Sequence, residues 1–126
     1  MDKTSLEKLF TAQKEFFRSG KTRGLDFRIE SLNKLRQAVE TYEQDILQAV
    51  YKDLHKDPID GRAMEISGFY AEVKYTVKNL PSWAATEPVE TPVYMLPSRS
   101  YIRREPYGVS LIIAPWNYPF QLIMMP

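Results

Sequence analysis

The chain has 126 residues, a length typical of one domain that can bury a core. Its 17 basic and 16 acidic residues nearly cancel, so the strong positive field of a nucleic-acid-binding protein is excluded and no nucleic-acid partner is expected. Cysteine is absent, which excludes disulfides, a thiolate nucleophile and thiolate metal ligands in this chain. With a single histidine, we expect no metal site.

Neither end of the chain resembles a membrane or export segment. The amino terminus lacks the apolar core of a signal peptide, so we expect a cytoplasmic location. Residues 109–126 are rich in apolar side chains but contain three prolines. A spanning helix needs about 20 mostly apolar residues, so we expect no membrane anchor, and a tail anchor is the least favoured alternative.

The first 20 residues are typical of an amphipathic helix. Thr4 and Glu7 have the spacing of a capping box, and Gly20 is a natural helix end. Leucine and phenylalanine follow at helical spacing, which favours packing against a core or an interface. Asp26 is a suitable cap for a second helix.

Two interpretations are open for the second helical segment. Residues 41–44 have a second capping-box sequence, so we predict a break near Glu40 and Thr41. A single helix continuing to Leu54 is the alternative. His55 has no carboxylate or nucleophile nearby in the sequence, so we interpret it as a residue of the helix end rather than a general base.

A third apolar stripe predicts a helix capped by Asp60 and ended by Pro81. Gly68 lies inside this helix, where glycine disfavours helix by about 1 kcal/mol relative to alanine, and it indicates close approach by another segment. The stripe consists of Ile66, Phe69, Tyr70, Val73, Val77 and Leu80.

Prolines after Glu87 exclude a helix and favour extended backbone. We predict two strands, Thr91–Leu96 and Ser100–Arg104, joined by a turn at Pro97 and Ser98. Two strands alone are marginally stable in water, so we expect them to join a partner sheet.

The last stretch begins with an almost unbroken apolar run, Val109–Ala114, which is rich in β-branched residues. This pattern predicts a strand buried on both faces, as in a parallel sheet. The run ends at Pro115, and Pro119 sets the backbone for a helix beginning at Asn117 or Tyr118. Open α/β sheets bind ligands at the carboxyl ends of such strands.

Several blocks of this sequence resemble one known family, in the same order and from about Phe10 to the last residue. They are Phe17-Arg18-Ser19-Gly20-Lys21-Thr22-Arg23, Phe27-Arg28-Ile29, Asp53-Leu54-His55-Lys56, Leu80-Pro81-Ser82-Trp83-Ala84, Glu87-Pro88-Val89, Glu105-Pro106-Tyr107-Gly108-Val109 and Ile112-Ile113-Ala114-Pro115-Trp116-Asn117-Tyr118-Pro119-Phe120. The family is the aldehyde dehydrogenases, and the Trp-Asn-Tyr-Pro-Phe version resembles their class 3, fatty-aldehyde branch.

The resemblance implies an α/β parent fold with a Rossmann-type cofactor domain, of which this chain is an amino-terminal portion. The chain itself is expected to be mostly α-helical, with a β-hairpin and the first strand of the parallel sheet. Residues 1–86 would form a helical layer of the cofactor domain, 87–107 an extended hairpin of the oligomerisation sheet, and 108–126 the first strand and helix start of an incomplete cofactor-binding sheet. A homodimer, or self-association, is expected.

The resemblance also implies a reaction. In this family a cysteine thiolate attacks the aldehyde, a hydride passes to NAD or NADP, and a glutamate-assisted water releases the acid. Asn117 matches the asparagine that stabilises the oxyanion, and Tyr118 is implied to lie at the substrate channel. The residues implied at the nicotinamide end of the cofactor site are Ile113, Ala114, Pro115 and Trp116.

The parent is therefore expected to oxidise medium-chain, long-chain or aromatic aldehydes through a thiohemiacetal. The isolated chain has no cysteine, so we expect it to be inactive and to bind no cofactor. The alternative is a non-enzymatic helical dimerisation or interaction module derived from that family.

Overall fold

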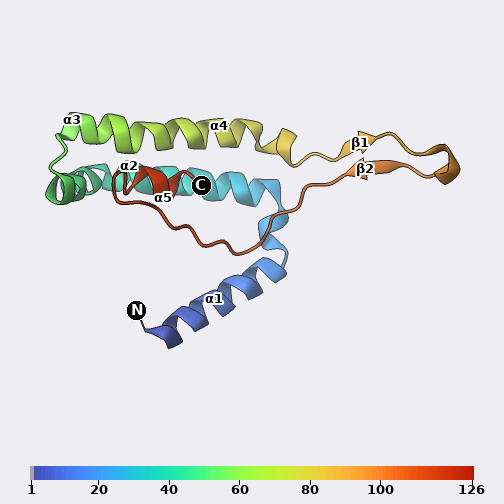
Figure 1. Cartoon of the computed structure of the whole chain (residues 1–126), viewed down its shortest axis with the longest axis horizontal. Coiled ribbons are helices and arrows are strands. Elements are labelled where there is room, and N and C mark those ends of the chain that lie inside the picture. The colour runs from blue at the N-terminus through green and yellow to red at the C-terminus, as the bar shows by residue number, and fades with distance from the viewer. Residues whose placement is uncertain (1) are drawn as a thin grey trace.

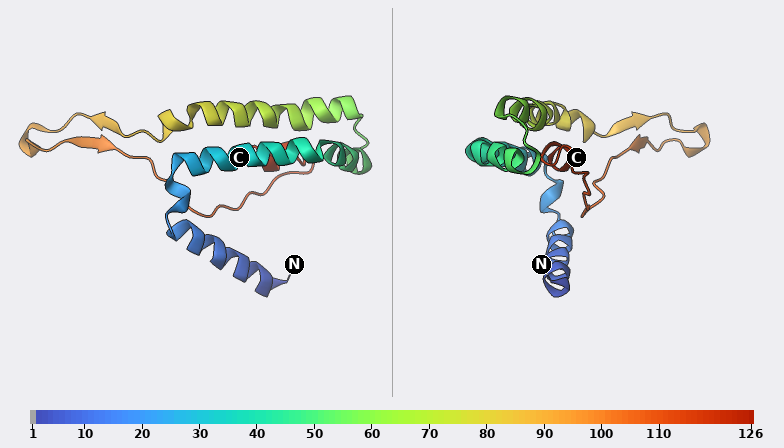
Figure 2. Two further views of the ribbon diagram at one scale, coloured as in Figure 1. Left: turned by 180° about the vertical axis from the view of Figure 1, so that it is seen from behind. Right: turned by 60° about the vertical axis from the view of Figure 1, so that its left-hand side comes forward.

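The computed structural model describes residues 2–126, and its core lies between two long helices. Helix α2, Leu25–Leu54, and helix α4, Ser67–Trp83, lie side by side (Figures 1 and 2). The short helix α3, Pro58–Gly61, and the π-helical segment η2, Arg62–Ile66, connect them. The buried apolar side chains between these helices are Val39, Leu47, Val50, Ile66, Phe69 and Val73.

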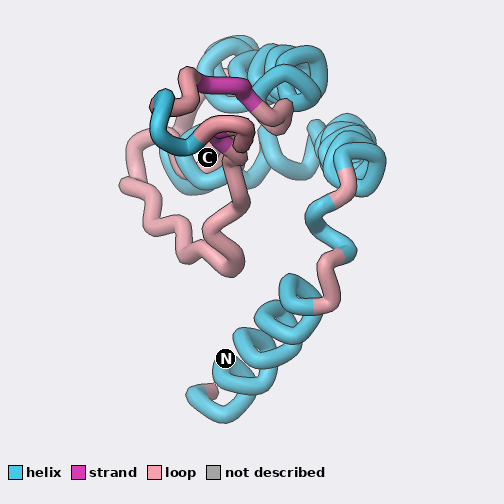
Figure 3. The backbone as a smooth tube through the Cα atoms, turned by 90° about the vertical axis from the view of Figure 1, so that its right-hand side faces the viewer, coloured by secondary structure: helices cyan, strands magenta, loops and turns pink. Residues whose placement is uncertain are grey.

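Helix α1, Lys3–Arg18, extends away from the helix pair (Figure 3). A 3₁₀ turn, η1, Lys21–Arg23, connects α1 to α2. The predicted end is confirmed, because Gly20 adopts a left-handed conformation with φ of 78° just after the helix. The predicted Thr4 cap is wrong: the Asp2 carboxylate accepts the Ser5 N–H at 2.8 Å. The side-chain cap thus lies two residues earlier than the sequence indicates.

The predicted break near Glu40 and Thr41 is wrong, and the alternative of one continuous helix is correct. The Thr41 hydroxyl donates to the Gln37 carbonyl at 2.9 Å, so it is satisfied inside the helix and caps nothing. Buried apolar residues on either side, Val39 and Leu47, contact the same core, which favours an uninterrupted helix.

Both predicted boundaries of the third helix are also wrong. Asp57, not Asp60, is the cap, because its carboxylate accepts the Ile59 N–H at 2.8 Å. Helix α4 continues through Pro81 to Trp83. Proline is tolerated there because it lies in the last turn, where its missing N–H removes only one intrahelical bond.

A two-stranded hairpin projects from the end of α4 (Figure 1). Strand β1, Glu87–Val89, pairs antiparallel with β2, Ser100–Ile102, with Glu87 opposite Ile102. The predicted second strand is thus partly correct. The first is misplaced, because Thr91–Leu96 contains a 3₁₀ turn, η3, Val93–Met95.

One hydrogen bond explains this displacement. The Thr91 hydroxyl accepts the Ser100 N–H at 2.8 Å, which ends the ladder at the point where a strand was expected to begin. The predicted turn at Pro97 and Ser98 is present, with a cis Leu96–Pro97 bond and a 3.0 Å bond from the Ser98 N–H to the Met95 carbonyl.

The segment after β2 runs back along α2, on the side that faces α1, and ends in the short helix α5, Gln121–Met124 (Figures 1 and 2). The predicted strand Val109–Ala114 does not form in this chain: Leu111 and Ile113 are 85% and 86% exposed. A parallel strand needs a neighbouring strand with which to pair, and residues 2–126 supply none for this segment. The mostly helical chain with a hairpin is confirmed.

Candidate functional site

The loop of residues 115–120 lies against the junction of α3, η2 and α4. The Phe120 ring meets the fully buried Phe69 ring edge-on, with centroids 5.8 Å apart. At Gly68, the residue directly before Phe69, an added Cβ would lie 2.9 Å from Nε2 of Gln121. The close approach expected at this glycine is therefore confirmed, and the approaching segment is α5.

Two charged side chains hold the backbone of this loop. The Glu65 carboxylate forms an ion pair with Lys56, and its Oε2 accepts the N–H groups of Phe120 and Gln121 at 3.2 and 3.1 Å. The Lys56 ammonium also donates to the Asn117 carbonyl at 2.9 Å. The anionic carboxylate therefore supplies the hydrogen bonds that the first turn of α5 lacks.

Asn117 has a fixed backbone and an available side chain. Within residues 2–126, its side-chain amide makes no hydrogen bond to the protein, and the residue is exposed. The helix predicted to begin at Asn117 or Tyr118 begins at Gln121 instead, and its N-cap residue, Phe120, makes no side-chain cap bond. Asn117 therefore caps no helix, and its side-chain amide can donate to a ligand.

The neighbouring predicted residues surround Asn117 on one loop. The Tyr118 ring is half-buried and lies under the Lys56 ammonium, with 4.2 Å from Nζ to the ring centroid. Ile113 and Trp116 are 86% and 83% exposed, whereas Ala114 is partly buried. An exposed indole lies here beside backbone that makes no backbone hydrogen bond within residues 2–126, and a nicotinamide ring needs both a stacking surface and hydrogen-bond partners.

Sequence reasoning missed Glu65 and Lys56. Glu65 is the one buried charged residue among residues 2–126, with 0% exposure, and the Lys56 side chain is 18% exposed. One signal was available: Glu65 lies four residues before Phe69, on the apolar stripe of the helix. A carboxylate at a core position needs a partner.

A second polar cluster joins α2 to α4 away from the loop. The Tyr70 hydroxyl donates to Glu43 at 2.9 Å, and Arg62 pairs with the same carboxylate at 3.2 Å. Burial, and next the hydrogen bond to Glu43, raises the pKa of Tyr70 to about 12. This cluster contains none of the predicted site residues.

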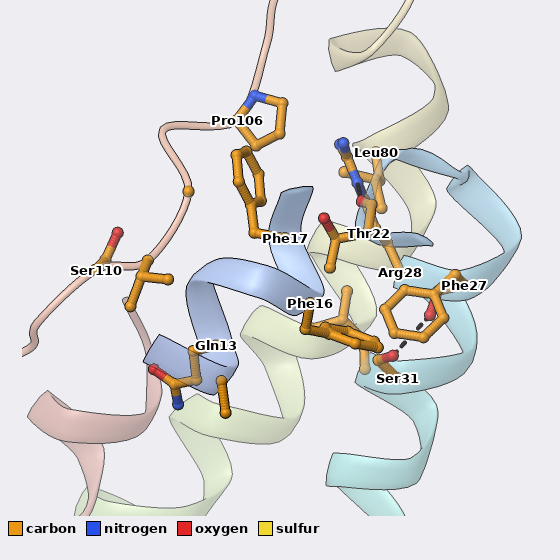
Figure 4. Close-up of a pocket in the computed structure, with 14 residues that line it drawn as sticks. Gln13, Phe16, Phe17, Thr22, Phe27, Arg28, Ser31, Leu80, Pro106 and Ser110 are labelled. Carbon is orange, nitrogen blue, oxygen red and sulfur yellow. Dashed lines mark hydrogen bonds between the residues drawn. The ribbon is translucent and has the colours of Figure 1, made fainter. Parts of the chain in front are cut away.

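A cavity of about 890 Å³ lies between α1, α2 and residues 106–110 (Figure 4). Its lining is mostly apolar, and the Phe16 and Phe27 rings meet at one side with centroids 5.9 Å apart. No predicted site residue lines it. The hydroxyl of Thr22 is its single buried polar atom without a partner in the part of the chain that the structure describes.

His55 is the C-cap residue of α2. It adopts a left-handed conformation with φ of 54°, and its ring stacks on Tyr51 at 5.9 Å. From Asp2 to Pro126, no cluster of three or more acidic, histidine or cysteine side chains could hold a metal ion. In the same range, no helix combines the length and apolar character that a membrane span requires.

Comparison with known proteins identifies the class to which this loop and fold belong. The family model "Aldehyde dehydrogenase family" matches residues 1–126, and the chain belongs to that family. A solved structure of substrate-bound Staphylococcus aureus AldH superimposes with a TM-score of 0.90 and 45% identity, covering 94% of this chain and 26% of that one.

Individual relatives are similarly informative. The chain is 46% identical over 121 residues to the 4,4'-diaponeurosporen-aldehyde dehydrogenase of Staphylococcus aureus, covering 96% of this chain and 26% of the relative. It is 44% identical over 110 residues to the dimeric NADP-preferring aldehyde dehydrogenase of Canis lupus familiaris, covering 87% and 24%. Family 3 member A2 of Macaca fascicularis is 38% identical over 113 residues, covering 90% and 23%. The resemblance to class 3 is confirmed, and the chain spans about a quarter of these relatives.

Proposed function

We propose that this chain forms part of the active site of an NAD- or NADP-dependent aldehyde dehydrogenase that oxidises medium-chain, long-chain or aromatic aldehydes to acids. One observation carries the proposal: Asn117 is held through its main-chain carbonyl, while its side-chain amide is exposed and unbonded within residues 2–126. A fixed neutral donor of this kind suits an oxygen that becomes negatively charged during the reaction.

The Asn117 side-chain amide would act in the first step of aldehyde oxidation. Attack of a thiolate on the aldehyde carbon forms a C–S bond and moves the carbonyl π electrons onto oxygen. Asn117 donates its side-chain N–H to this oxyanion, an interaction worth about 2.7–4 kcal/mol in comparable acyl-transfer sites. The thiolate and the glutamate that assists hydrolysis come from outside this chain, which contains no cysteine. The isolated chain is therefore inactive.

The nicotinamide cofactor supplies an acceptor for the hydride that leaves the substrate carbon. The Trp116 side chain and the backbone around Ile113, Ala114 and Pro115 would line the nicotinamide end of its site. In the complete protein, Val109–Ala114 forms the first strand of the parallel cofactor-binding sheet. Its exposed apolar residues support this proposal, because a partner sheet would bury them.

We base the proposed domain organisation and assembly on the same family resemblance. Residues 1–86 form the helical layer, 87–107 the oligomerisation hairpin and 108–126 the start of the cofactor sheet, in a homodimer. The Canis lupus familiaris relative, whose name describes it as dimeric, supports this assembly. Tyr118 lines the substrate channel beside Asn117. The cytoplasmic location stays a prediction.

A chimera tests the function. This chain replaces the matching region of the Staphylococcus aureus relative, which supplies the rest of the enzyme and shares 46% identity with it. We expect the chimera to oxidise a fatty aldehyde with NAD or NADP, and Asn117→Ala to lower kcat by about 10²- to 10³-fold. The 126-residue chain serves as the inactive control. Turnover by that chain alone, or an unchanged kcat in Asn117→Ala, would contradict the proposal.

A further inference from the structure

The loop that carries Asn117 is held by side chains from a distant part of the sequence. Lys56 lies 61 residues from Asn117, and Glu65 lies 55 and 56 residues from Phe120 and Gln121. Their bonds reach the backbone on both sides of the Tyr118–Pro119 pair. The loop is therefore held at both ends by one ion pair.

This ion pair is buried more deeply than stability alone would favour. Glu65 is fully buried, and the Lys56 side chain is 18% exposed. Taking an ion out of water costs several kcal/mol, and a well-packed apolar pair of similar volume is often equally stable. Glu65 compensates with three bonds, one to Lys56 and two to backbone N–H groups. An apolar replacement could fill the space but could not hold the loop backbone.

The helix that carries Glu65 is locally irregular. In η2, both the N–H and the hydroxyl of Ser67 bond to the Arg62 carbonyl, five residues earlier, the hydroxyl at 3.0 Å. Such π-helical turns are rare and occur frequently at functional sites. The irregular turn contains Glu65 and directs it toward the loop, where its carboxylate meets the start of α5.

We propose that Lys56 and Glu65 are positioning residues, which fix the backbone around Asn117 so that its amide points at the substrate oxygen. The proposal rests on the function proposed above, because it requires Asn117 to act on the substrate. Neither residue touches the reacting atoms. Their effect passes through the Asn117 carbonyl and through the Phe120 and Gln121 amides. Displacement of a catalytic group by about 1 Å can lower a rate about 100-fold.

The first test measures order at Asn117 without any activity. The chain contains three asparagines, Asn33, Asn79 and Asn117, so asparagine-selective ¹⁵N labelling of the 126-residue chain gives three resolvable residues. We expect Lys56→Met to reduce the heteronuclear NOE of the Asn117 backbone amide toward that of a chain end. Asn33 and Asn79, both in helices, should not change, and they report that the variant is folded.

The second test measures catalysis in the chimera. Lys56→Met should lower kcat about 10- to 100-fold while the KM for aldehyde changes less than 2-fold, since the loop is displaced but substrate contacts elsewhere persist. Lys56→Arg keeps the charge and donors and should restore most of the rate. Lys52→Met, an exposed lysine one turn earlier on α2, is the matched control and should leave kcat unchanged. Glu65→Met, which removes the acceptor oxygens as well as the charge, should reproduce Lys56→Met.

The outcomes separate this proposal from the function on which it rests. An inactive chimera, or an Asn117→Ala variant with full activity, contradicts the proposed aldehyde dehydrogenase function. Even then, loss of order at Asn117 in Lys56→Met supports the contacts that hold the loop. Unchanged order at Asn117 in Lys56→Met overturns the proposal. Lost order with an unchanged kcat overturns it as well, as does a fall in kcat that Lys56→Arg does not restore.

Discussion

The Tyr70 hydroxyl donates to the Glu43 carboxylate at 2.9 Å and joins the two long helices at one point. Tyr70 is partly buried and packs beside Phe69, with ring centroids 5.7 Å apart. Burial and the adjacent carboxylate both disfavour the phenolate, so the pKa of Tyr70 rises to about 12. The helix pair therefore carries a contact that depends on pH.

This contact predicts a loss of stability in alkali. The folded-state pKa of Tyr70 lies above the unfolded value of about 10, so its stabilising contribution is complete below pH 10 and is lost as the pH rises toward 12. Urea titrations from pH 8 to 11, followed by circular dichroism, should show the free energy of unfolding falling above pH 10. Tyr70→Phe should cost about 1 kcal/mol at neutral pH and should flatten that fall. If the free energy of unfolding falls equally steeply above pH 10 in Tyr70→Phe, the fall comes from the other tyrosines and lysines and not from Tyr70.

The core contact between Phe69 and Phe120 predicts a large effect of truncation. Phe69 is fully buried, so Phe69→Ala removes its packing and leaves a cavity, which should lower the free energy of unfolding by about 3–5 kcal/mol. Phe10→Ala is the control, since Phe10 is 50% exposed on α1, and it should change stability far less. Equal losses in the two variants would show that α1 packs more tightly than its exposure indicates.

Gly68 predicts a coupling between α4 and α5. Alanine should favour the helix by about 1 kcal/mol, but its Cβ would lie 2.9 Å from Nε2 of Gln121 and displace that side chain. We expect Gly68→Ala alone to be nearly neutral and Gly68→Ala with Gln121→Ala to recover the helix preference. Chemical denaturation of the four proteins of this double-mutant cycle should give a coupling of about 0.5–1 kcal/mol. Additive effects would contradict the close approach.

The sequence predicts the helices well where an apolar stripe fixes one face. The residues of the third stripe include Ile66, Phe69 and Val73, and all three are buried. Helix ends are predicted less well, because local cap signals compete with the rest of the fold. Thr41 has a capping-box spacing, but its hydroxyl bonds inside α2 while core packing continues past it.

The site is predictable only in part, for a related reason. The loop from Ile113 to Tyr118 was found by resemblance, since its residues are contiguous. The Lys56 and Glu65 contacts span more than 50 residues, so no local pattern contains them. The predicted strand Val109–Ala114 fails in this chain because a strand is defined by its neighbours, and apolar content alone supplies no hydrogen-bond partner.

His55 gives the prediction that best separates structure from catalysis. Its left-handed conformation, with φ of 54°, is costly for a residue with a Cβ and suits glycine. His55→Gly should therefore raise the free energy of unfolding by about 1 kcal/mol. Loss of the stacking between the His55 ring and Tyr51 should reduce this gain slightly. Urea denaturation measures this, with His55→Ala as the control that keeps the strain.

In the chimera, His55→Gly should leave kcat within 2-fold of the parent, because the imidazole lies at a helix end, where its ring stacks on Tyr51 and its Nδ1 lies 3.2 Å from the Tyr51 carbonyl. A general base would behave differently, since its removal typically lowers the rate about 10²- to 10⁴-fold. A fall of that size would make His55 catalytic and contradict its assignment to the end of α2.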